Sequence, residues 1–238
     1  MALSAMILSM LVFAHRGVQD RKIAENTLVA FRRAVLAGAD GLEFDLRVSR
    51  DGIPVVAHDE NLHRIAGDAR RVRDLSAKEL GKVVLRGQGG IPTLNDVTSG
   101  IPQPIMFDME IKDRGTLDPL IKKLGTSASL RGRTLVSSFV SEDLKRLKKS
   151  LPDVRVMLLH RRWPIPFRGQ RHWEHLFKLP LWGVGFRAQS LNPTRVRWLQ
   201  RKGWKVAAWD EQPLKKEARH IRSLGVDIAI VYKVRGAA

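Results

Sequence analysis

The stretch G-L-E-F-D-L-R-V-S-R-D-G-I-P-V-V-A-H at 41–58 decides the fold, because it holds two apolar runs joined by a sharp turn. Asp51-Gly52 is a strong signal for a two-residue hairpin. We therefore expect a strand at Gly41–Val48 to pair antiparallel with a short strand at Ile53–His58.

Outside this hairpin, apolar runs alternate with stretches whose apolar residues recur every three or four positions. The remaining predicted strands are Leu8–Ala14, Ile105–Ile111, Thr134–Phe139, Val154–Leu159, Leu181–Phe186, Lys205–Trp209 and Ile228–Val231. The predicted helical stretches are 27–37, 76–84, 116–124, 141–149, 193–201 and 213–223, and 160–180 is interpreted as an elaborated loop. With the hairpin strand set aside, eight strands remain. This pattern predicts an α/β fold: a single (β/α)₈ TIM barrel domain over 1–238, with a small hairpin insertion after the second strand.

Composition narrows the class of protein. The 238 residues include no cysteine, which excludes disulfides and thiolate metal ligands. No apolar run reaches 18 residues, so no membrane-spanning helix is expected. Met1–Ala14 is apolar, but no Lys or Arg precedes it, so we do not expect a cleaved signal peptide and predict a cytoplasmic location, with peripheral membrane association as an option.

The positive charge is concentrated in the second half of the chain. The net charge is +18, and Arg131–Arg222 holds 22 Lys/Arg against 7 Asp/Glu. The same stretch holds all the tryptophans: Trp163, Trp173, Trp182, Trp198, Trp204 and Trp209. A basic, tryptophan-rich face suits an anionic membrane surface, nucleic acid or an anionic substrate. A solvated basic surface with tryptophans in the core is an equally supported interpretation.

Carboxylates occur at two-residue spacing on two of the predicted strands. Glu43 and Asp45 share one face of their strand, as do Asp108, Glu110 and Lys112 on another. Three carboxylates (Glu43, Asp45 and Glu110) meeting at the mouth of a barrel would repel one another without a cation. An all-oxygen set favours one divalent cation, Mg²⁺ or Ca²⁺, with Mn²⁺ also an option. The alternative is that these residues form surface salt bridges.

Two histidines are expected at the same end of the barrel. His15 follows the first strand, and His58 ends the hairpin strand. Histidines near a metal serve as general acid and general base, so this pair is the candidate catalytic set. Asp59 has two candidate roles, orienting a histidine or capping the following turn, and we favour the cap.

Further polar residues surround this predicted mouth. Arg16 and Lys112 suit phosphate oxygens, and their alternative role is an ordinary salt bridge to neighbouring carboxylates. Gly17 permits a sharp turn after Arg16. In Glu25-Asn26-Thr27, Asn26 or Thr27 suits a helix N-cap, and Glu25 is expected to reach the mouth.

An ordered series of segments resembles the glycerophosphodiester phosphodiesterase family. The series is H-R-G at 15–17, E-N-T at 25–27, A-F-R-R-A at 30–34, G-A-D-G-L-E-F-D at 38–45, D-G-I-P-V-V-A-H-D at 51–59, I-P-T-L at 91–94, M-E-I-K at 109–112, S-S-F at 137–139, G-W-K-V-A-A-W at 203–209 and G-V-D at 225–227. Each segment alone is weakly specific, whereas the ordered series is highly specific and spans almost the whole chain.

This resemblance implies a TIM barrel enzyme that uses a divalent metal to hydrolyse glycerophosphodiesters to sn-glycerol 3-phosphate and an alcohol. Position by position, it implies metal ligands at Glu43, Asp45 and Glu110, and an acid/base pair at His15 and His58. It places Arg16 and Lys112 on the phosphate and Glu25 and Asn26 in the site. Trp209 resembles the family's aromatic wall near the glycerol.

The sequence also departs from the family pattern. Asp210-Glu211 stands where Thr-x-Asn is usual, Val231-Tyr232-Lys233-Val234 replaces Thr-Asp-x-Pro, and alanine replaces the proline before Glu25. These changes bear on the alcohol side of the substrate. A second enzymatic hypothesis, which rests on the tryptophan- and arginine-rich loop 161–173 and the basic region, is a lysophospholipase D that contacts an anionic membrane through that loop. A third is a non-enzymatic basic barrel that binds anions or nucleic acid, which the intact set of acidic and histidine residues disfavours.

Overall fold

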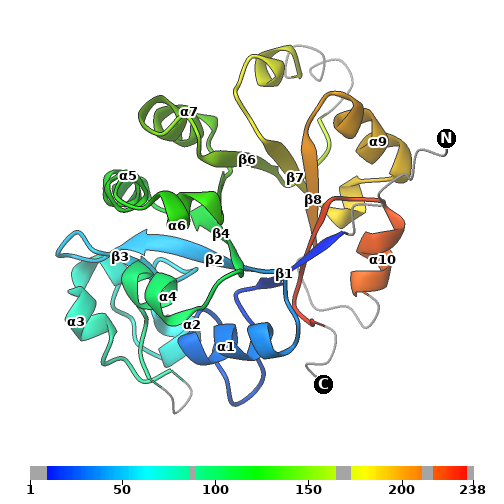
Figure 1. Cartoon of the computed structure of the whole chain (residues 1–238). Coiled ribbons are helices and arrows are strands. Elements are labelled where there is room, and N and C mark those ends of the chain that lie inside the picture. Colours follow the sequence, from blue (N-terminus) through cyan, green and yellow to red (C-terminus); the bar gives the residue numbers. More distant parts are fainter. Residues whose placement is uncertain (1–9, 86–88, 165–172, 211–216, 235–238) are drawn as a thin grey trace.

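The protein forms a closed barrel of eight parallel strands. The structure, a computed structural model, describes residues 10–85, 89–164, 173–210 and 217–234. Within these ranges β1 pairs with both β2 and β9, which closes the ring (Figure 1). The barrel strands are β1 (Leu11–His15), β2 (Gly41–Val48), β4 (Met106–Ile111), β5 (Thr134–Ser138), β6 (Arg155–His160), β7 (Gly183–Arg187), β8 (Lys205–Trp209) and β9 (Ile228–Val231). The predicted TIM barrel is confirmed.

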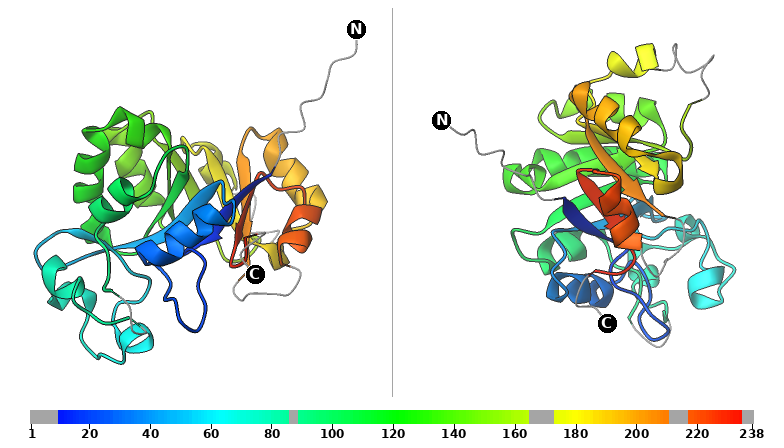
Figure 2. Two further views of the ribbon diagram at one scale, coloured as in Figure 1. Left: turned by 60° about the horizontal axis from the view of Figure 1, so that its bottom comes forward. Right: turned by 90° about the vertical axis from the view of Figure 1, so that its right-hand side faces the viewer.

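The predicted hairpin follows the second strand. β3 (Pro54–Val56) runs antiparallel to β2, with Val56 opposite Leu46. The chain then forms α2 (His63–Ala66), η1 (Val72–Asp74) and α3 (Ala77–Leu80), the last shorter than the expected 76–84. This excursion lies at one end of the barrel (Figure 2). It has a core of its own that includes Ala24, Val55, Leu62, Val72, Leu80, Leu85 and Ile91.

Helices surround the barrel on its outside (Figure 1). They are α1 (Leu28–Leu36), α4 (Leu94–Gly100), α5 (Leu117–Gly125), α6 (Ala128–Gly132), α7 (Ser141–Ser150), α9 (Pro193–Arg201) and α10 (Glu217–Ser223), with 3₁₀ turns η2 (Arg114–Thr116) and η3 (Ala188–Ser190). Sequence periodicity missed α4 and α6, which are short. The signal for α4 is its capping box, in which Thr93 and Asp96 bond to each other's backbone N–H groups.

Alternation along the strands separates an apolar layer from a polar one. On β2, Leu42 and Phe44 face outward into the core beneath the helices, so Glu43 and Asp45 face the barrel interior. The lower interior is filled by Phe13, Leu135, Met157, Leu159, Ala207, Ile228 and Ile230. Gly41 makes room for this layer, because a Cβ there would lie 2.6 Å from the Phe13 ring. The carboxylates therefore stand on an apolar floor.

Four of the six tryptophans pack together beside β7. Trp163, Trp173, Trp198 and Trp204 form a contiguous aromatic cluster with Phe177 and Phe186. Trp173 and Trp204 are buried within it. This arrangement favours the interpretation of these tryptophans as core residues. Most of the segment 161–173, at 165–172, lies outside the described residues, so its membrane contact stays a prediction. In the part of the chain that the structure describes, we find no helix with the length and apolarity needed to cross a bilayer.

Candidate active site

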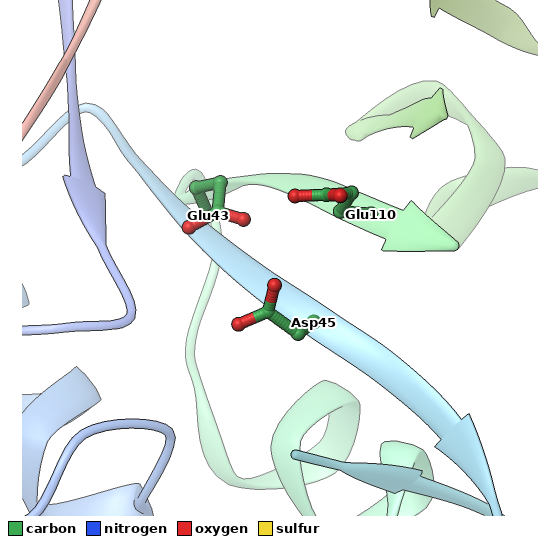
Figure 3. A group of neighbouring side chains, drawn as sticks. All are labelled: Glu43, Asp45 and Glu110. Carbon is green, nitrogen blue, oxygen red and sulfur yellow. The ribbon is translucent and has the colours of Figure 1, made fainter. Parts of the chain in front are cut away.

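Strand register brings the predicted acidic residues together. Asp45 on β2 lies directly opposite Glu110 on β4, and Glu43 lies between His15 on β1 and Asp108 on β4. One carboxylate oxygen from each of Glu43, Asp45 and Glu110 lies within 4.8 Å of the other two. Figure 3 shows the three carboxylates turned toward a common point from two neighbouring strands. Glu43 and Glu110 line a pocket of about 310 Å³, and Asp45 beside them is fully buried.

Two cations are interleaved with this acidic group. Arg16 Nε lies 2.9 Å from Asp45 Oδ2. Lys112 Nζ lies 2.6 Å from Glu110 Oε1 and 3.4 Å from Asp45 Oδ1. Arg16 and Lys112 also line the pocket. Each therefore forms the salt bridge that was one of its predicted roles and is also placed to contact a bound phosphate, the other predicted role.

An unusual backbone conformation places Arg16 and Asn26. Both have positive φ, 58° and 57°, in the left-handed region that non-glycine residues rarely adopt. The Asn26 N–H donates to the carbonyl of Arg16, and Asn26 Nδ2 donates to Asp45 Oδ2 at 2.9 Å. Thr27 caps α1, since its hydroxyl accepts from the Ala30 N–H. Asn26 therefore supports Asp45, while Thr27 is the helix cap. Gly17 makes the predicted sharp turn, with a φ of 80° and no room for a Cβ against Ala30.

The Glu25 carboxylate is held by two arginines. Arg16 Nη1 donates to it at 3.1 Å, and Arg64 on α2 binds both of its oxygens, at 2.6 and 3.0 Å. Glu25 is buried beside the pocket and does not border it. In this structure its direct contacts are therefore with the arginines that surround the site.

His58 is oriented by its neighbour, and the cap predicted for Asp59 is wrong. Asp59 Oδ1 lies 2.6 Å from His58 Nδ1, and Asp59 Oδ2 accepts from Arg64 Nε. The helix that follows has no side-chain cap bond. Burial lowers the pKa of His58, against the opposing pull of Asp45. Sequence reasoning missed Arg64 because only folding brings α2 back to residues 25 and 59.

His15 lies at the junction of the acidic group and the pocket. Its Nε2 is 3.6 Å from Glu43 Oε2, and its ring meets Tyr232 edge-on with centroids 4.5 Å apart. Burial, helped by Arg16, lowers the pKa of His15 to about 3. The imidazole is therefore neutral at neutral pH. Tyr232 is one of the departures from the family pattern, and it lines the pocket.

The electrostatics of the acidic group fit a divalent cation. Burial, with Asp45 and Glu110 nearby, raises the pKa of Glu43 well above its ordinary range, and burial raises the pKa of Glu110 to about 7. Burial would also raise the pKa of Asp45, but Arg16 and Lys112 outweigh it and lower that pKa. Glu43 and Glu110 therefore resist ionisation in this structure, and with all three carboxylates ionised the group would hold one negative charge more than Arg16 and Lys112 balance, which a bound cation would offset. Three converging carboxylate oxygens are the ligands that Mg²⁺, Ca²⁺ and Mn²⁺ prefer.

The opposite wall of the pocket has a different character. We call four pocket-lining residues at the C-terminal ends of β6, β7 and β8 the far wall: Arg161, Arg187, Trp209 and Asp210. In the ring order of the strands, β6 lies opposite β1, and β7 lies opposite β2. Trp209 borders the pocket as predicted and meets Phe139 edge-on, with centroids 6.0 Å apart. Sequence patterning did not indicate Arg161 or Arg187, because Arg161 directly after β6 and Arg187 at the end of β7 belong to no recognisable motif.

Comparison with known proteins agrees with this geometry. Residues 15–234 match the model of the glycerophosphoryl diester phosphodiesterase family. The chain belongs to this family. It is 30% identical over 234 residues to a glycerophosphodiester phosphodiesterase from Caldanaerobacter subterraneus, covering 91% of each chain. The family consists of phosphoric diester hydrolases, so the prediction of an enzyme of this class is confirmed.

Solved structures show the same barrel. A glycerophosphodiester phosphodiesterase from Thermotoga maritima is 26% identical and superimposes with a TM-score of 0.76, covering 95% of this chain and 96% of that one. A phosphodiesterase from Oleispira antarctica, solved with its product sn-glycerol 3-phosphate, is 25% identical with a TM-score of 0.79, covering 93% of each chain.

Proposed function

We propose that the chain hydrolyses glycerophosphodiesters to sn-glycerol 3-phosphate and an alcohol, with the help of one divalent cation. The observation that carries this proposal is the meeting of Glu43, Asp45 and Glu110 beside a pocket that His15 and Arg16 also line. The family match supports the reaction class, and the product bound by the Oleispira antarctica relative supports the substrate class. The single-domain organisation over 1–238 and a cytoplasmic location remain predictions.

Glu43, Asp45 and Glu110 would hold the cation, Mg²⁺ or Ca²⁺ in the first instance. When bound, the cation neutralises charge on the phosphate oxygens and lowers the pKa of an oxygen nucleophile. Arg16 and Lys112 would donate to the remaining phosphate oxygens. Both border the pocket, and both are already fixed by Asp45, so little side-chain freedom is lost on binding.

The two histidines would move the protons. One accepts the proton of the attacking oxygen, from water or from the substrate's own glycerol hydroxyl, as the new P–O bond forms. The other gives a proton to the departing alkoxide as its P–O bond breaks. In His58 the Nδ1 atom is engaged by Asp59, which leaves Nε2 for proton transfer. Glu25 and Asn26 would act by holding Arg16 and Asp45 in place.

The direct test measures glycerol 3-phosphate release from glycerophosphocholine with Mg²⁺, with Ca²⁺ and with EDTA. His15→Ala is the inactive control, and Arg162→Ala, an exposed arginine outside the pocket, is the matched active control. The expected result is turnover that EDTA and His15→Ala abolish. Turnover that survives both would overturn the proposed site.

An apolar rim favours lysophospholipids as a second substrate class. Phe139 lines the pocket yet is 38% exposed, and the adjacent Val140 is 39% exposed. Apolar surface at the mouth suits an acyl chain or a membrane surface. Choline release from lysophosphatidylcholine, assayed in parallel, distinguishes this lysophospholipase D activity. Binding to anionic vesicles that weakens with rising salt would accompany it, whereas nucleic-acid retention is not expected.

A further inference from the structure

The far wall places two arginines at the ends of adjacent strands. His160 on β6 pairs with Phe186 on β7, so Arg161 and Arg187 are the next residues along each strand. Both line the pocket that contains the acidic group. Two guanidinium groups at neighbouring strand ends repel each other, and this repulsion is relieved when an anion binds between or beside them.

These arginines are separate from the cations that serve the acidic group. Arg16 and Lys112 are committed to Asp45, Glu25 and Glu110 through short contacts. Arg161 instead packs its guanidinium over the Phe139 ring, 5.4 Å from the centroid, and within the described residues it forms no ion pair. Arg161 is exposed and Arg187 half-buried, and together they outnumber the one carboxylate of the far wall, the buried Asp210, so net positive charge faces the pocket from the side opposite β1 and β2.

The position of a bound diester explains how the positive charge of the far wall would discriminate between leaving alcohols. A phosphate held by Arg16 and Lys112 lies beside β1, β2 and β4, and one end of the diester must extend across the pocket. With Trp209 beside the glycerol, as the family resemblance implies, the leaving alcohol extends past it toward Arg187, its register partner on β7, and Arg161 after β6. A cationic alcohol such as choline would bind there more weakly than an anionic one, so its diester would be turned over less efficiently.

On the basis of the proposed phosphodiesterase function, we propose that Arg161 and Arg187 select diesters whose leaving alcohol carries an anionic group. The group is a carboxylate or a phosphate, because both match the fork of a guanidinium. These arginines are specificity residues: they contact the leaving alcohol and leave the acid/base chemistry to His15 and His58.

The test compares kcat/KM within two matched pairs of substrates. Glycerophosphoserine differs from glycerophosphoethanolamine by one carboxylate, and glycerophosphoinositol 4-phosphate differs from glycerophosphoinositol by one phosphate. We expect the anionic member of at least one pair to be favoured by about tenfold, the usual size of a charge-assisted contact. The two pairs separate the carboxylate from the phosphate source.

Substitution then assigns the preference to the arginines. In Arg161→Gln/Arg187→Gln the preference should fall to about twofold or less, since each lost guanidinium removes a contact that the member without the added carboxylate or phosphate never makes. Arg162→Gln, which changes an exposed neighbour outside the pocket, should keep the wild-type preference. A wild-type preference near one in both pairs, or one that survives the double substitution, would overturn this inference while leaving the phosphodiesterase intact. If no diester is hydrolysed at all, the proposed function fails and this inference fails with it.

Discussion

The two walls of the pocket differ in how their charges are satisfied. On the wall formed by β1, β2 and β4, buried acidic and basic groups contact one another within 2.6–3.6 Å. On the far wall, Asp210 is buried with neither oxygen hydrogen-bonded among the described residues, and Arg161 has only an aromatic ring beneath it. The first wall is preorganised for chemistry. On the far wall, Asp210 and Arg161 have no such ionic contacts among the described residues, which suits contact with a substrate.

The largest effects are expected on the first wall. His15→Ala or His58→Ala should each lower kcat by about 10²–10⁴-fold, the usual contribution of a general acid or base. The loss should be equal for every diester, because the histidines serve the reacting oxygens. Steady-state kinetics with the ethanolamine and serine diesters measure it. A loss of kcat for only one of the two diesters would contradict the assignment of the histidines to the reacting oxygens.

A smaller but clear effect is expected from Asp59→Asn and from Arg64→Ala. Each removes a charge-assisted bond that holds His58 or Glu25, worth about 1.5–3 kcal/mol, or about 10–100-fold in rate. The pH profile of kcat should also shift for Asp59→Asn, because the Asp59 carboxylate raises the pKa of His58. Unchanged kcat and an unchanged profile would show that this contact is not needed for His58 to act.

Asp108→Asn should stabilise the protein in EDTA at pH 8. Burial raises the pKa of Asp108 to about 7, above the ordinary value of 3.8. In the folded protein the Asp108 carboxyl therefore resists ionisation more than in the unfolded chain. The free energy of unfolding is highest while Asp108 is protonated and falls as pH rises from about 4 to 7. The substitution removes this loss, on the order of 1–4 kcal/mol at pH 8 and nearly nothing at pH 4. Urea unfolding at both pH values measures it. Equal effects at pH 4 and pH 8 would contradict the electrostatic cause.

The smallest effect is expected from Trp209→Ala on the far wall. Loss of the ring removes an aromatic contact worth about 0.5–1.5 kcal/mol, so KM for glycerophosphocholine should rise about 2–10-fold. The kcat should change by less than about twofold, because Trp209 contacts no proton-transfer group. A kcat that falls as much as it does for His15→Ala would contradict this assignment and show that Trp209 takes part in the chemical step.

The residues of the wall formed by β1, β2 and β4 could be predicted from the sequence better than those of the far wall, for a physical reason. Glu43, Asp45 and Glu110 lie on strands whose two-residue spacing and parallel order already imply where they meet, and β2, β8 and β9 have the predicted bounds. Asp59 was misread and Arg64 missed, because their contacts depend on how a short insertion folds back. Asp210 was noted only as a departure from the family pattern, and Arg161, after β6, and Arg187, at the end of β7, carry no local pattern, so the closed ring of strands is needed to place them at the pocket.

The same limit applies to the basic, tryptophan-rich region. Its composition suggested a surface for membranes or polyanions, yet Trp173 and Trp204 are buried in an aromatic cluster. Lys202 and Arg195 stack on rings of that cluster. Composition records which residue types are present, whereas burial depends on how the helix α9 packs against β7 and β8.

Manganese binding followed by electron paramagnetic resonance tests the central contrast most directly, because the two walls each hold buried carboxylates. Glu43→Gln/Asp45→Asn changes the first wall, and Asp210→Asn is the matched change on the far wall. We predict one bound Mn²⁺ per chain in the wild type and in Asp210→Asn, with affinity lowered by about 100-fold or more in the double variant. Unfolding curves in EDTA confirm that each variant is folded. Retention of the ion by the double variant, or its loss from Asp210→Asn, would contradict the account.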